Sequence, residues 1–186
     1  MALPITYDFE GFSDSDAFTS LLGPFGLTAT VTNATVITAG VSLNDFDFPP
    51  VSGRNVIYDS GGAMTIAFST GVQSIAGLFT YNGPVTMLAY SGSVQVGSVA
   101  SALSENYLSS GNTPQELLQI SGIGLFDTVV ISGSQFGGSF VVDDLTIDVP
   151  EAVGVPEPGT LSLLALGVSL GWYRRRKQSG LRVASN

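Results

Sequence analysis

The stretch 139-SFVVDDLTIDV-149 is predicted to form a β-strand, because β-branched and aromatic residues alternate along it with polar ones. Successive side chains of a strand point to opposite faces of the sheet. One face then holds Val141, Asp143, Leu145, Ile147 and Val149, and the other holds Phe140, Val142, Asp144, Thr146 and Asp148. An unpaired buried carboxylate is costly, so Asp143 needs a cation, main-chain N–H donors or a place at the rim of the sheet.

Nine further runs of this kind precede that stretch, and turn formers such as 82-NGP-84 and 91-SGS-93 separate them. They cover residues 5–10, 28–38, 55–58, 64–69, 72–80, 85–90, 94–99, 118–121 and 126–132. About ten short strands without long amphipathic segments between them predict an all-β protein, an antiparallel β-sandwich of jelly-roll type. Two short helical segments are expected, at residues 14–22 and at 113–116, where Thr113 and Glu116 have capping-box spacing.

The segment 150-PEAVGVPEPG-159 holds three prolines and two glycines, which is typical of a linker. The predicted organisation is a β-sandwich ectodomain over residues 1–149 and a linker over 150–159. A short transmembrane helix over 160–173 and a basic cytoplasmic tail over 174–186 complete it.

Charge and composition exclude several classes of function. Residues 1–155 hold 14 of the 15 acidic side chains and a single base, Arg54, so this region would repel a nucleic-acid backbone. The chain has no cysteine and no histidine, which excludes disulfides, thiolate metal sites and catalysis by Ser-His-Asp or Cys-His groups. Chemistry that uses carboxylates alone, such as glycoside hydrolysis, stays open.

The run 161-LSLLALGVSLGWY-173 has 13 residues and no charge. As a helix it would be about 20 Å long, against roughly 30 Å for the hydrocarbon core of a bilayer, so it predicts a marginal membrane anchor. The cations Arg174, Arg175, Arg176 and Lys177 follow at once. Such a cluster acts as a stop-transfer signal that stays cytoplasmic, which places the preceding domain on the other side of the membrane.

Val155, Pro156, Glu157 and Pro158, followed by this run and the basic cluster, resemble the PEP-CTERM sorting signal of Gram-negative bacterial surface proteins. The resemblance implies that an exosortase, a membrane-embedded cysteine protease-transpeptidase, processes the tail near Pro156–Pro158. Proteins with this signal are associated with exopolysaccharide and biofilm export. We therefore expect a single-pass membrane precursor in the cell envelope, whose domain reaches the cell surface or the extracellular space after processing.

Proteins with this signal normally begin with a secretory signal peptide. Met1 to Pro4 lead directly into the first predicted strand, with neither a cationic region nor an apolar region before it. We expect that such a leader has been trimmed or that its start codon lies upstream.

Asp8 and Glu10 of the first predicted strand, with Asp143 and Asp144 of the last, are candidate ligands of a structural Ca²⁺ ion. First and last strands of sandwich folds commonly lie close together, and carboxylate oxygens suit Ca²⁺. The pattern resembles that of calcium-stapled jelly-roll carbohydrate-binding modules. Three alternatives stay open: an ion pair of Asp143 with Arg54, a solvated strand end, or a hydrogen-bonded pair of aspartates.

Seven aromatic residues are candidates either for the core or for a sugar-stacking surface: Phe46, Phe48, Tyr58, Phe79, Tyr81, Tyr90 and Tyr107. Tyr81 and Tyr107 are the predicted glycan contacts, because both are placed in loops. Asp45 and Asp47 are the only carboxylate pair considered for a hydrolase. The expected function is a non-enzymatic structural or exopolysaccharide-associated role, with a calcium-stapled carbohydrate-binding module and an extracellular glycoside hydrolase as alternatives.

Overall fold

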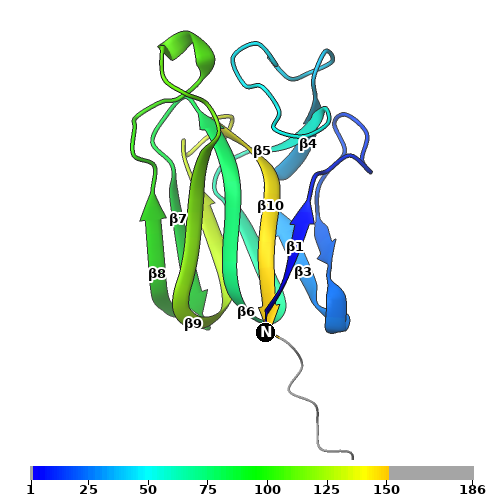
Figure 1. Ribbon diagram of the computed structural model, residues 1–186, viewed down its shortest axis with the longest axis vertical. Coiled ribbons are helices and arrows are strands. Elements are labelled where there is room, and N and C mark those ends of the chain that lie inside the picture. The colour runs from blue at the N-terminus through cyan, green and yellow to red at the C-terminus, as the bar shows by residue number, and fades with distance from the viewer. Residues whose placement is uncertain (1, 151–186) are drawn as a thin grey trace, which may run out of the picture. The chain divides into compact units, whose positions relative to one another are not determined.

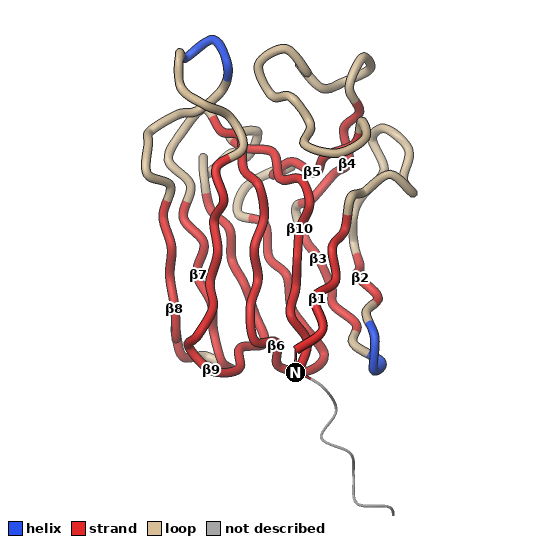
Figure 2. The backbone as a smooth tube through the Cα atoms, in the orientation of Figure 1, coloured by secondary structure: helices blue, strands red, loops and turns tan. Residues whose placement is uncertain are grey.

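The computed structural model describes residues 2–150 of the chain (Figure 1). Strands make up nearly all of its regular structure, and the only helical segments in this part are two single 3₁₀ turns (Figure 2). The elements are β1 Ala2–Tyr7, β2 Ser20–Leu22, η1 Pro24–Gly26, β3 Thr28–Thr32, β4 Ala34–Thr38, β5 Asn55–Asp59, β6 Met64–Tyr81, β7 Thr86–Ser91, β8 Val94–Ala100, η2 Leu108–Ser110, β9 Glu116–Ser132 and β10 Phe140–Pro150.

Two long strands, β6 and β9, belong to both layers of the sandwich. Their register shifts between Ala67 and Ser74, where both strands turn over at the lower end of Figure 1. One layer runs β1, β10, residues 74–81 of β6 and residues 116–121 of β9. The other runs β2, β3, the start of β6, the end of β9, β7 and β8. All pairings between these strands are antiparallel, which confirms the predicted antiparallel β-sandwich.

The sequence interpretation divided each of these long strands into two. The predicted runs 64–69 and 72–80 are one strand, β6, and the runs 118–121 and 126–132 are parts of β9. A strand that bends from one layer into the other carries the same small and polar residues that normally end a strand. Local sequence therefore does not separate the two cases.

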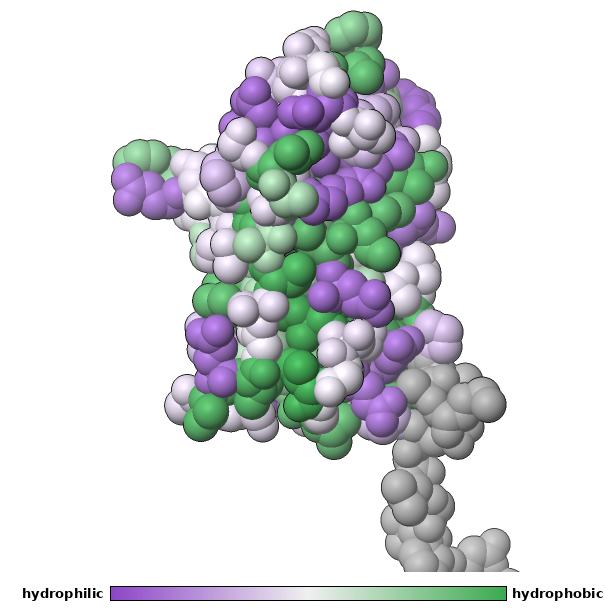
Figure 3. Space-filling view, turned by 60° about the vertical axis from the view of Figure 1, so that its left-hand side comes forward, coloured by the Kyte–Doolittle hydropathy of each residue, from purple (hydrophilic) through white to green (hydrophobic). Residues whose placement is uncertain are grey.

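One contiguous core fills the space between the layers. Its largest fully buried side chains include Phe18, Phe79, Tyr81, Phe126 and Phe140. A second, small cluster of Leu43, Val56 and Val141 lies where β4 and β5 join β10. Hydrophobic side chains also reach the surface over β8 and β9 (Figure 3), where Val94, Leu117 and Leu125 are each more than half exposed.

The predicted helix over residues 14–22 is wrong. Its backbone pairs with the neighbouring strands, because Phe18 N–H donates to Ala34 and Asp16 accepts from Val36 N–H. The Asp14 carboxylate accepts a hydrogen bond from Thr38 N–H at 2.9 Å. Aspartate side chains that bond main-chain groups in this way compete with helix formation.

The predicted turn of helix at residues 113–116 is also wrong. Glu116 begins β9, and its carboxylate accepts hydrogen bonds from the Tyr81 hydroxyl and from Ala102 N–H rather than capping at Thr113. The preceding residue, Gln115, has a positive φ of 68° and donates to the carbonyls of Pro49 and Pro50. Contacts with distant segments therefore replace the local cap.

A β-bulge in β10 overturns the simple alternation predicted for this strand. The register with β6 shifts between Asp143 and Thr146, and Asp144 has a φ of 48°. Before the bulge, Phe140 and Val142 face the main core, and after it Leu145, Ile147 and Val149 do. Asp143 therefore does not share a face with Leu145 but lies on the side of the small cluster that contains Val141.

Candidate functional site

The pairing of β1 with β10 confirms the expectation that the first and last strands lie side by side, with Tyr7 opposite Leu145. Just beyond β1 and at the bulge of β10, two carboxylates hold the same segment of chain. These are Glu10 and Asp143, and the segment is the end of the loop formed by residues 39–54, which joins β4 to β5.

Asp143 is 2% exposed, and main-chain donors satisfy its carboxylate. One oxygen accepts hydrogen bonds from Val51 N–H at 2.7 Å and Ser52 N–H at 3.0 Å. The other accepts from Asp144 N–H at 2.8 Å, and the Ser52 hydroxyl donates to the Asp144 carboxylate at 2.8 Å. Burial raises the pKa of Asp143, while the N–H groups of Ser52 and Val51 act in the opposite direction.

Glu10 holds the last residues of the same loop. One of its oxygens accepts from Arg54 N–H at 2.8 Å and from Asn55 N–H at 2.7 Å. Gly53 has a φ of 51°, and a β-carbon there would lie 2.1 Å from the Glu10 carboxyl carbon, so only glycine allows this approach. The side chain of Arg54 donates to the carbonyl of Ala39 at 2.6 Å, which gives it a partner other than Asp143.

Three of the four predicted calcium ligands, Glu10, Asp143 and Asp144, thus bond residues of one loop. The fourth, Asp8, accepts from Glu10 N–H at 3.2 Å, so each of the four has a protein donor. Within residues 2–150, no group of three or more acidic side chains stands close enough to hold a metal ion. Calcium binding stays a prediction.

The two predicted glycan contacts have different surroundings. Tyr81 is 0% exposed and its hydroxyl donates to Glu116, so its ring is not available for stacking on a sugar. Tyr107 is half-buried and stacks on Phe48, with ring centroids 6.1 Å apart and an interplanar angle of 18°. The sequence placed both residues in loops, but Tyr81 is the last residue of β6 and points into the core.

Asp45 and Asp47 lie in the loop 39–54, where Asp47 is a structural anchor. It accepts hydrogen bonds from Ser109 N–H and the Ser109 hydroxyl, and from the Asn44 side chain at 2.9 Å. The hydroxyl of Ser109 is the main reason why the pKa of Asp47 is lowered. A glycosidase acid needs a raised pKa, so this environment does not suit Asp47 as a proton donor.

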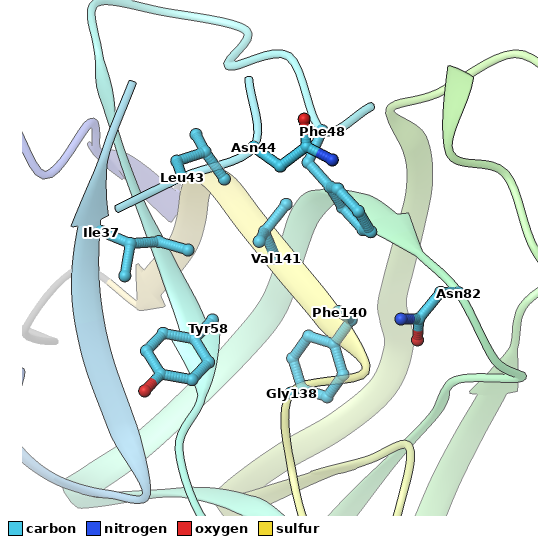
Figure 4. A pocket seen from close by; sticks show the side chains of 9 residues that line it. All are labelled: Ile37, Leu43, Asn44, Phe48, Tyr58, Asn82, Gly138, Phe140 and Val141. Atoms are coloured by element: carbon cyan, nitrogen blue, oxygen red, sulfur yellow. The ribbon is translucent and has the colours of Figure 1, made fainter. Parts of the chain in front are cut away.

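An open cavity of about 180 Å³ lies between the loop 39–54 and the strands beside it (Figure 4). Phe140 and Val141 of β10 form its floor, and Phe48 and Tyr58 approach it from opposite sides. The remaining lining residues are Ile37, Leu43, Asn44, Asn82 and Gly138. The sequence interpretation named Phe48 and Tyr58 only among seven aromatic candidates, and it missed Asn44 and Asn82, because these residues converge only in the folded domain.

Among residues 2–150, no helix has the length and apolar character needed to cross a bilayer. The predicted linker, transmembrane helix and basic tail lie outside the described residues, apart from Pro150 at the end of β10.

Residues 154–177 match the PEP-CTERM protein-sorting motif. The match confirms the sorting signal expected from Val155, Pro156, Glu157, Pro158 and the basic cluster that follows. A signal of this kind indicates an exported protein of the cell envelope or cell surface. No curated protein matches the chain in sequence.

Several solved structures have some similarity to this chain. The K2 cleaved adhesin domain of Lys-gingipain has a TM-score of 0.49 and 12% identity, covering 78% of this chain and 99% of that one. A family 29 carbohydrate-binding module complexed with mannohexaose has a TM-score of 0.39 and 14% identity, covering 85% and 99%. A family 61 module in complex with β-1,4-galactotriose has a TM-score of 0.37 and 16% identity, covering 66% and 88%. At these low scores the similarities carry no argument about a ligand.

Proposed function

We propose that this chain is the precursor of a non-enzymatic bacterial surface or matrix protein that associates with exopolysaccharide and is released from its tail by an exosortase. The observation that carries the proposal is the sorting motif at residues 154–177, directly after a domain whose last strand ends at Pro150. In this proposal a jelly-roll-like sandwich stands outside the cytoplasm. The transmembrane helix predicted over residues 160–173 would anchor it only until the chain is cut near Pro156–Pro158.

Glu157→Ala in the producing bacterium tests this proposal, with Glu151→Ala as a matched control just before the motif. We expect the wild type and Glu151→Ala to be recovered at the cell surface or in the medium with a C-terminus near Pro156–Pro158. Glu157→Ala should accumulate in the membrane fraction at full length. Intact-mass measurement of each fraction is the readout, and full-length wild type free in the cytosol would contradict the proposal.

The second candidate is a carbohydrate-binding module stapled by Ca²⁺. The specific support is the arrangement at the loop 39–54, where Glu10 from the start of the domain and Asp143 from its end hold neighbouring residues. The carboxylates of Asp8, Glu10, Asp143 and Asp144 would have to turn toward one another from the positions described above to bind a calcium ion, and the bound ion would then join the two ends of the domain through its oxygen ligands.

A further inference from the structure

The loop 39–54 is unusually long for a connection inside a compact domain. Connections are commonly 4–6 residues, and loops beyond about 12–15 residues without secondary structure of their own are usually functional or disordered. This loop is tied down along its length, by Asp47 to Ser109 and Leu108, by Asp143 to Val51, and by Glu10 to its end. Ordering a long loop costs conformational entropy. Because the tethers hold this loop in one conformation despite that cost, we expect the conformation to have a function.

The tethers fix the aromatic wall of the cavity. Phe48 N–H donates to the main-chain carbonyl of Asn44 at 2.9 Å, and the Phe48 ring stacks on Tyr107. Tyr58 is held in β5, which pairs with both β4 and β10. The two rings are therefore positioned before any ligand arrives, which reduces the entropic cost of binding.

The lining of the cavity is uncharged, with aromatic and aliphatic surfaces inside and amide groups at the edge. The Asn44 side chain donates one N–H to Asp47, and its side-chain oxygen, which accepts no hydrogen bond from residues 2–150, can accept one from a ligand; Asn44 and Asn82 are both exposed. A sugar ring has the matching chemistry: its C–H face packs on aromatic rings, and its hydroxyl groups exchange hydrogen bonds with amides.

The charge of the domain narrows the class of sugar. Residues 2–150 carry 13 acidic side chains and one base, Arg54, whose guanidinium donates to the carbonyl of Ala39. Asp45 and Asp47 belong to the same loop as the cavity wall. This field repels polymers that carry carboxylate or sulfate groups and leaves uncharged ones unaffected.

We propose that the cavity between the loop 39–54 and β5 and β10 binds one ring of an uncharged polysaccharide. Phe48 provides the stacking face, Tyr58 closes the opposite side, and Asn44 and Asn82 contact hydroxyl groups. The inference rests on the proposed association with exopolysaccharide and adds the class of polymer and its place on the domain.

The test uses the full chain, purified in a polyoxyethylene detergent because a glycoside detergent would compete for the cavity. Native gels containing a soluble glucan, mannan, galactan or xylan measure retardation, and alginate serves as the anionic polymer. The hexasaccharide of the most retarding polymer is then titrated calorimetrically. We expect at least one neutral polymer, and not alginate, to retard the wild type.

Phe48→Ala should weaken hexasaccharide binding at least tenfold, and Asn82→Ala should weaken it about threefold, as expected for loss of a stacked ring and of one hydrogen bond. Phe25→Ala, an exposed phenylalanine of η1 outside the cavity lining, should bind like the wild type. Asn82 is exposed, so Asn82→Ala tests the cavity even if Phe48→Ala fails to fold.

Equal binding by the wild type, Phe48→Ala and Asn82→Ala would overturn the cavity as the site while leaving the association with polysaccharide intact. Retardation by alginate alone, or by no polymer, would overturn the assignment of a neutral polysaccharide. Neither result bears on export, which the Glu157→Ala experiment decides separately.

Discussion

Asp59 is a carboxylate that the fold buries completely, at 0% exposure. It accepts hydrogen bonds from Ser139 N–H at 2.9 Å, the Ser139 hydroxyl at 2.8 Å and Phe140 N–H at 3.1 Å. Burial raises its pKa above the ordinary value of 3.8, although these donors act against the shift. The residue thus joins the end of β5 to the start of β10 at an electrostatic cost.

This cost has a defined dependence on pH. A carboxyl group whose pKa is raised by folding holds its proton more tightly in the folded state than in the unfolded one. Its contribution to stability is therefore fully present below pH 3.8 and is lost as the pH rises through the pKa of the folded state. This is the opposite of the usual acid denaturation.

Asp59→Asn should remove this dependence. The carbonyl oxygen of the new amide can still accept from Ser139 N–H and Phe140 N–H, and its N–H₂ group replaces only the oxygen that accepts from the Ser139 hydroxyl. The loss of stability at low pH should therefore be about 1 kcal/mol, the worth of one hydrogen bond. The free energy of unfolding of the variant should fall less steeply than that of the wild type as the pH is raised from 4. Urea titrations at a series of pH values give the change of the free energy of unfolding with pH for the wild type and for Asp59→Asn. Asp148→Asn, at a half-buried aspartate of β10, is the control. Parallel slopes for the wild type and Asp59→Asn would contradict the assignment.

At the scale of elements, β10 depends on the loop that leads into it. Gly137 has a φ of 79°, and a β-carbon there would lie 2.3 Å from the carbonyl oxygen of Asp59 and 2.4 Å from Gly61 N. Its neighbour Gly138 also has a positive φ, of 68°, but a β-carbon there would meet nothing within 4 Å. The pair separates the cost of a backbone conformation from the cost of a steric clash.

Gly138→Ala should cost about 1 kcal/mol, for placing a side chain in the left-handed region. Gly137→Ala should cost about 3 kcal/mol or more, because rigid main-chain atoms must also move. Thermal or urea unfolding of the two variants measures the difference. Equal losses in the two variants would show that the loop adapts to the new β-carbon.

The bulge in β10 shows where element-level reasoning from sequence fails. The period of two correctly predicted a strand over residues 139–149, and ten of its eleven residues lie in β10. A single residue with a positive φ, Asp144, then reverses which faces are buried on its two sides. Aspartate tolerates that conformation, but an aspartate within a predicted strand is not by itself a sign of a bulge, so the sequence did not predict one.

At the scale of the molecule, the first and last strands lie together, and calcium is the ion proposed to staple them. If 1 mM Ca²⁺ is a concentration about 100-fold above the dissociation constant for the folded state, the free energy of unfolding rises by about 2.7 kcal/mol. That corresponds to a rise in melting temperature of about 5–10 °C. The comparison needs EDTA and Mg²⁺ at matched ionic strength, because screening alone stabilises an acidic domain.

Asp144→Asn should abolish the calcium shift, whereas Asp148→Asn, a second half-buried aspartate of β10, should retain it. Differential scanning calorimetry of the three proteins provides the readout. An equal rise in melting temperature with Mg²⁺, or in Asp144→Asn with Ca²⁺, would contradict a specific calcium site and indicate general screening of the acidic side chains.

The sequence alone determined the class of fold and the sorting signal. Both are local properties: the period of two along a strand such as β10, and the order of Pro156, Glu157 and Pro158, an apolar run and four cations. Such patterns need no knowledge of which residues meet in space.

Only the tertiary structure decided that Asp143 and Glu10 hold one loop, that Tyr81 is buried, and that Phe48, Tyr58 and Asn82 surround a cavity. These residues come from four parts of the chain, and their positions depend on strand register, on the bulge at Asp144 and on the tethers of the loop 39–54. Each of these is set by the packing of the whole domain, because the local conformations that compete at each position differ by only about 1–3 kcal/mol.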